Sequence, residues 1–156
     1  MDTASLSEIK AALKVMSREA LEQQLLRMAK YKKENKELLS FILFDEEDKL
    51  QFIKDCKHDM GLLFASINFS TSYVSAKGLR KILKFVTKCV RFSADKTVEI
   101  ELLAEFCSQM SALAPRFRSS TVLAQLYDKQ VEKVYRAMEH LHEDIRADYR
   151  KLAQAL

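Results

Sequence analysis

Glycine and proline are almost absent from this chain, and their scarcity constrains its fold more than any other feature. The 156 residues include two glycines and one proline. A β-rich fold of this length needs many tight turns, which these two residue types serve best. Hydrophobic residues make up 48% of the chain and charged residues 31%, which suits a packed core beneath a wetted surface. The sequence therefore predicts an all-α fold.

Local capping signals mark where several of these helices begin. Ser5 and Glu8 have the spacing of a capping box, and Ser17 can cap the next helix. Asp45 can cap a further helix, whose first turn would hold the acidic residues 46–48. The sequence Ser-Ala-Asp at 93–95 predicts a break between two later helices.

Two apolar patterns predict the placement of other helices. Residues 38–44 are so densely apolar that more than one face of their helix must be covered, which predicts a central position. From residue 120 to 153, apolar residues recur at helical spacing with no helix breaker between them. This pattern predicts one long C-terminal helix, with a kink near Leu141 as the alternative.

A leucine pattern occurs twice and suggests an internal repeat. Shifted by 58 positions, Ser17, Leu21, Leu25 and Lys30 align with Ser75, Leu79, Leu83 and Lys88. Two helical hairpins, at residues 17–44 and 75–113, would produce this pattern, as in α-solenoids whose repeats bury their apolar sides against neighbours. Chance matching of two amphipathic helices is the alternative.

Across residues 17–113 the pattern resembles HEAT or armadillo-like helical repeats in its architecture. This resemblance implies a small right-handed α–α superhelix of about seven helices. The chain length predicts a single domain spanning residues 1–156. An up-and-down helical bundle is the alternative architecture. The stretch Lys30–Leu39 is also similar to segments of uncharacterised bacterial proteins, a similarity that implies no activity.

The sequence also bears on location and redox state. It begins without the basic and apolar segments of a secretory signal, and no apolar run approaches the roughly 20 residues of a membrane span. We therefore expect a cytoplasmic protein that does not enter a membrane. Cys56, Cys89 and Cys107 lie far apart in apolar helical patterns, which predicts buried, reduced thiols.

The main candidate for function is a row of cations in the fifth predicted helix, residues 76–92. Six of them recur at steps of three and four residues, opposite an apolar face: Lys77, Arg80, Lys81, Lys84, Lys88 and Arg91. No acidic residue interrupts this face, whereas ordinary surface helices mix both signs of charge. Such a face could bind an acidic protein surface or nucleic-acid phosphates. A merely solvated helix face is the alternative.

A second candidate is an anion site before the last predicted helix. Arg116 and Arg118 precede Ser119 and Ser120, at a helix start where free N–H groups and the helix dipole favour an anion. Simple N-capping by either serine is the alternative, because the segment lacks the glycines of a phosphate loop.

Several acidic and histidine residues have spacings that occur in metal-binding motifs. Glu34, Glu37, Asp45 and Asp48 have short spacings that resemble the magnesium motifs of all-α nucleotide pyrophosphatases, although each pair also suits a helix start. Asp55 with His58 and Glu139 with His142 have the acid-x-x-histidine spacing of di-metal bundles, but the first pair falls on a solvent-facing side. We expect no resident metal and no cofactor.

These observations predict a scaffold or adaptor rather than an enzyme, with a basic helix face that binds an acidic protein. The net charge of +4 is too small to attract anionic partners without local clustering. A nucleic-acid-binding protein, or a metal-dependent enzyme acting on phosphorylated small molecules through the four acids above, are the alternatives.

Overall fold

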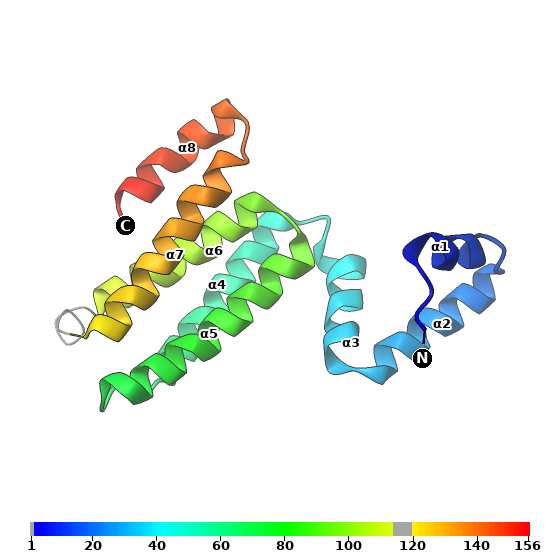
Figure 1. Cartoon of the computed structure of the whole chain (residues 1–156), viewed down its shortest axis with the longest axis horizontal. Helices are drawn as coiled ribbons and strands as arrows, with labels where there is room; N and C mark the ends of the chain where they lie inside the picture. Colours follow the sequence, from blue (N-terminus) through cyan, green and yellow to red (C-terminus); the bar gives the residue numbers. More distant parts are fainter. Residues whose placement is uncertain (1, 114–119) are drawn as a thin grey trace. The chain divides into compact units, whose positions relative to one another are not determined.

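The computed structural model describes residues 2–113 and 120–156. These residues form eight α-helices, one π-helical turn and no strand. In chain order the elements are α1 (Leu6–Lys14), α2 (Arg18–Tyr31), α3 (Lys33–Ser40), the π-helical turn η1 (Phe41–Asp45), α4 (Lys49–Ala65), α5 (Ser72–Ser93), α6 (Lys96–Ala112), α7 (Thr121–Glu139) and α8 (Glu143–Gln154). The predicted all-α fold is confirmed (Figure 1).

The chain divides into two compact units, residues 1–44 and residues 45–156. In the N-terminal unit, local signals fix the starts of α1 and α2 as predicted. The hydroxyl of Ser5 accepts a hydrogen bond from the Glu8 amide, and the Glu8 carboxylate accepts one from the Ser5 amide, which completes the capping box. Ser17 caps α2 by accepting a hydrogen bond from the amide of Ala20.

The segment between α3 and α4 departs from the prediction. Asp48 rather than Asp45 caps α4, by accepting a hydrogen bond from the Gln51 amide at 2.9 Å. Residues 46 and 47 therefore precede the helix instead of forming its first turn. The apolar run 38–44 is not a buried central helix either, since Phe41 is its one buried member and Phe44 is 78% exposed.

The core of the C-terminal unit forms around α6. This helix packs against α4, α5 and α7, and its buried residues lie on several of its faces. They are Val98, Ile100, Leu102, Leu103, Ala104, Phe106, Cys107 and Met110. The ring of Phe106 lies 5.5 Å from that of Phe64 on α4, measured between centroids, in a tilted arrangement that favours aromatic pairs.

All three cysteines are buried in this unit and are free, as predicted. Burial raises the pKa of the Cys107 thiol to about 12, because a thiolate would lose its solvation there.

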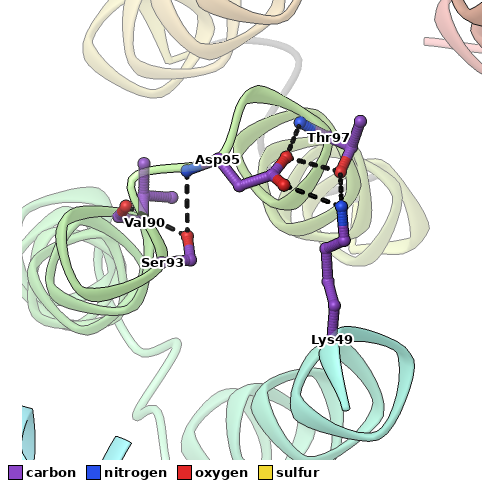
Figure 2. A network of polar contacts seen from close by, with 5 residues as sticks. All are labelled: Lys49, Val90, Ser93, Asp95 and Thr97. Atoms are coloured by element: carbon purple, nitrogen blue, oxygen red, sulfur yellow. Dashed lines mark hydrogen bonds and ion pairs between the residues drawn. The ribbon is translucent and has the colours of Figure 1, made fainter. Parts of the chain in front are cut away.

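A polar network fixes the corner between α5 and α6 (Figure 2). Ala94 ends α5 in the left-handed conformation, with φ of 49°, and Asp95 caps α6 by accepting a hydrogen bond from the Thr97 amide at 2.7 Å. Lys49 at the start of α4 donates to the Asp95 carboxylate at 2.7 Å. The start of α4 is thereby tied to the start of α6.

The predicted long helix over 120–153 is wrong, because α7 ends at Glu139 and α8 begins at Glu143. The two helices pack against each other, and the hydroxyl of Tyr135 on α7 donates to the Ala153 carbonyl near the end of α8 at 3.2 Å. The guanidinium of Arg146 on α8 accounts for the break. It donates to the carbonyls of Met138, Glu139 and Leu141, which a continuing helix would have used itself.

Helices α2 and α3 lie next to each other, as do α5 and α6, but neighbouring helices in the chain do so in many folds, and the predicted hairpins stay a prediction. The internal repeat, the right-handed superhelix and the single-domain organisation stay predictions. Among the described residues, no helix combines the length and the apolar character needed to cross a membrane.

Candidate interaction surface

The candidate surface lies on α5, whose two faces differ sharply in chemistry. Thr71 caps the helix by accepting a hydrogen bond from the Val74 amide at 3.2 Å. One face is buried and includes Leu79, Ile82 and Val86, each at most 1% exposed. No aspartate or glutamate occurs anywhere in the 22 residues of α5. The six cations lie on the opposite side, within an arc of about 100° at the 100° rotation of each helical residue.

We call these six residues, Lys77, Arg80, Lys81, Lys84, Lys88 and Arg91, the basic stripe. Five of them are exposed and Lys88 is half-buried. The Lys88 ammonium lies 5.9 Å from the centroid of the Phe85 ring, at the outer limit of a cation–π contact. From Lys77 to Arg91 the stripe extends about 21 Å, at the 1.5 Å rise of an α-helix.

Two acidic residues near α5 pair with lysines outside the basic stripe. Lys57 on α4 pairs with Glu101 on α6 at 2.6 Å, and Lys49 pairs with Asp95. Within residues 2–113 and 120–156, no ion pair reaches Lys77, Arg80, Lys81, Lys84 or Arg91. These five cations therefore keep their charge available to an external anion.

A groove of about 440 Å³ adjoins one end of the stripe, where α4 ends and α5 begins. Leu63, Ile67, Val74 and Ile82 provide its apolar lining, and Lys77 and Lys81 stand one helical turn apart along it. Gly78 lies between the two lysines. A Cβ atom at Gly78 would approach the Ile67 side chain to 3.0 Å, so the missing side chain lets Ile67 pack closely on α5. We call this hollow the Gly78 groove.

The predicted anion site falls largely outside the described residues, which omit Arg116, Arg118 and Ser119. Ser120 is described and is the N-cap residue of α7. Its hydroxyl makes no capping hydrogen bond to the described first turn of that helix.

Four of the candidate metal ligands have other interactions in the structure. Glu37 lies 3.9 Å from the Lys33 ammonium, and Asp48 caps α4. Asp55 accepts a hydrogen bond of 2.8 Å from the side-chain amide of Gln51. The Nδ1 atom of His142 lies 3.3 Å from the Asp144 carboxylate. Among the described residues, no three histidine, cysteine or acidic side chains gather closely enough to hold a metal ion.

Comparisons of the chain with protein-family models, with curated proteins and with solved structures found no match. The geometry of α5 and its surroundings is therefore the basis on which function is inferred.

Sequence reasoning identified the basic stripe but missed the groove beside it. Leu63, Ile67 and Val74 come from two helices and their connection, and the sequence reveals no relation between them. The available signal was Gly78, a glycine inside a helix between two lysines, because such a residue often marks close approach of another element.

Proposed function

We propose that the chain is a scaffold or adaptor protein whose basic stripe binds an acidic surface of a partner protein. The observation that carries this proposal is the set of five exposed cations without ion pairs to described residues, on a helix that has no acidic residue. A row of like charges repels itself, so an opposing row of carboxylates lowers the free energy of both surfaces.

The small number of exposed aromatic rings on α5 favours a protein over single-stranded nucleic acid. Single-stranded nucleic acid is bound by cations together with several exposed aromatic rings that stack on bases. Tyr73, 77% exposed, is the exposed aromatic residue that α5 provides. Carboxylates on a partner helix or loop need no such rings.

The proposal is tested with fluorescent poly-L-glutamate as a stand-in for an acidic protein surface, and with a DNA duplex of about 20 base pairs as the alternative ligand. The stripe variant is Arg80→Glu/Lys84→Glu/Arg91→Glu, which spares the lysines of the Gly78 groove. We expect the unchanged protein to bind poly-L-glutamate with an affinity that falls as salt is added, because exposed charges are screened. The stripe variant should bind at least tenfold more weakly.

A control variant, Lys129→Glu/Lys133→Glu/Lys151→Glu, changes the net charge equally at exposed lysines of α7 and α8. It should bind nearly as well as the unchanged protein. Equal losses in both variants would attribute binding to net charge and remove the stripe from the proposal. Stronger binding to the DNA duplex than to poly-L-glutamate would replace the acidic protein by nucleic acid.

A further inference from the structure

The Gly78 groove combines an apolar lining with two cations, so its occupant must supply both an apolar side chain and carboxylates. Leu63, Ile67 and Val74 offer apolar surface that is incompletely covered, and covering such surface is favourable. Lys77 and Lys81 lie along the groove and have no ion pair with a described residue.

The chain itself carries a segment with this chemistry. Leu43 is 62% exposed and Phe44 is 78% exposed, although both are large apolar residues. Asp45, Glu46 and Glu47 follow directly and are exposed. No ion pair within the described part of the chain involves these three acids. The segment 43–47 thus presents two apolar side chains beside three free carboxylates.

The carboxylates of this segment lie at the opposite end of α4 from the groove of their own chain. Asp48 caps the first turn of α4, whereas Leu63 and Ile67 lie at its far end. The 17 residues of α4 separate these ends by about 25 Å. Glu46 and Glu47 are at most three residues from Lys49, so their backbone extends at most about 11 Å from it, well short of the far end of α4.

We propose that the Gly78 groove binds residues 43–47 of a second copy of this chain, with Leu43 or Phe44 against the apolar lining and Glu46 and Glu47 paired with Lys77 and Lys81. This inference rests on the proposed function and deepens it, because it names the partner at one end of the basic stripe. Arg80, Lys84 and Arg91, which lie outside the groove, stay available to a different acidic protein.

The test is sedimentation velocity of the full chain from about 1 to 200 µM. The unchanged protein should show a mass that rises with concentration, and high salt should weaken the association. The groove variant Lys77→Glu/Lys81→Glu and the segment variant Glu46→Lys/Glu47→Lys should each associate at least tenfold more weakly, because each opposes like charges.

An equimolar mixture of these two variants tests directly whether the groove pairs with the segment. Glutamates in the groove of one chain then meet lysines in the segment of the other, and the second groove keeps its native pairing. Association should therefore return in the mixture. Circular dichroism of each variant establishes that it is folded, and Arg80→Glu/Lys84→Glu, which lies outside the groove, should associate as the unchanged protein does.

A chain that stays monomeric over this range would overturn the inference, as would a mixture that fails to associate. Binding of poly-L-glutamate that depends on Arg80, Lys84 and Arg91 is independent of these results. Loss of self-association alone would therefore leave the proposed function standing.

Discussion

Lys49 and Asp95 are 46 positions apart in the sequence and form an ion pair of 2.7 Å. The Asp95 carboxylate also accepts hydrogen bonds from the amide and the hydroxyl of Thr97, at 2.7 and 2.6 Å (Figure 2). Burial alone would raise the pKa of Asp95, but the hydrogen bonds from Lys49 and Thr97 favour the carboxylate and hold the pKa at about 2, below the ordinary 3.8. Stability should therefore depend on pH through this residue.

We expect the Asp95 contribution to be fully present above pH 4 and to be lost as pH falls from about 4 to 2, because a group with a lowered folded-state pKa resists protonation. Asp95→Asn should reduce the free energy of unfolding at pH 7 by about 1–2 kcal/mol, after allowance for the solvent exposure of the pair. Urea unfolding at pH 7 and pH 3 measures both effects. Asp128→Asn, at an exposed position on α7, is the control and should leave the pH dependence unchanged. Equal pH dependence in Asp95→Asn and the unchanged protein would contradict the assignment.

The two glycines provide a matched pair for testing how the Gly78 groove is built. A Cβ atom at Gly61 would meet nothing within 4 Å, whereas one at Gly78 would meet Ile67 at 3.0 Å. Gly61→Ala should stabilise the protein by about 1 kcal/mol, the difference in helix propensity. Gly78→Ala should gain clearly less or lose stability, because the Ile67 side chain must move. Thermal unfolding of the two variants compares them directly, and equal gains would show that Ile67 does not pack closely on Gly78.

The helix starts that the sequence predicts correctly depend on residues close in the chain. Ser5 meets Glu8 and Ser17 meets Ala20 within a single turn, so their spacing is enough to identify the caps. Asp45 and Asp48 could not be separated in this way, because either aspartate at the ends of this acidic run can cap a helix. The choice depends on where α4 packs, and at its start Lys49 reaches Asp95.

In the candidate surface, too, local features could be predicted and features that depend on tertiary packing could not. The basic stripe follows from helical periodicity, which is local. Whether acids of other helices neutralise it depends on tertiary packing, and the pairing of Glu101 with Lys57 could not be inferred from the sequence. The Gly78 groove likewise requires α4 and α5 to meet at Ile67.

Gln130 is a polar residue of α7 that is 3% exposed within the core. Its side-chain nitrogen donates to the Leu126 carbonyl at 3.0 Å, but its side-chain oxygen has no hydrogen-bond partner among the described residues. An unsatisfied buried oxygen costs about 1–3 kcal/mol. Gln130→Met, which keeps the length of the side chain, should therefore raise the free energy of unfolding by about 1 kcal/mol. Urea unfolding measures the change, and Gln125→Met at an exposed position should have little effect. A loss of stability in Gln130→Met would show that the oxygen is satisfied.

Arg146 joins α8 to the end of α7 through three hydrogen bonds of 3.0 Å, to the carbonyls of Met138, Glu139 and Leu141. A flat guanidinium can serve several carbonyls at once, whereas a lysine ammonium lacks this geometry. We expect both Arg146→Met and Arg146→Lys to lower the free energy of unfolding, by about 1–2 kcal/mol, since hydrogen bonds from charged groups are among the stronger ones. In both variants, amide hydrogen exchange should accelerate more in α8 than in α6, because α8 loses its attachment to α7 while α6 keeps its packing in the core. Arg150→Met, at an exposed position of the same helix, serves as the control and should change neither measurement. Full stability in Arg146→Lys would show that charge alone holds the two helices together, rather than the three-carbonyl geometry.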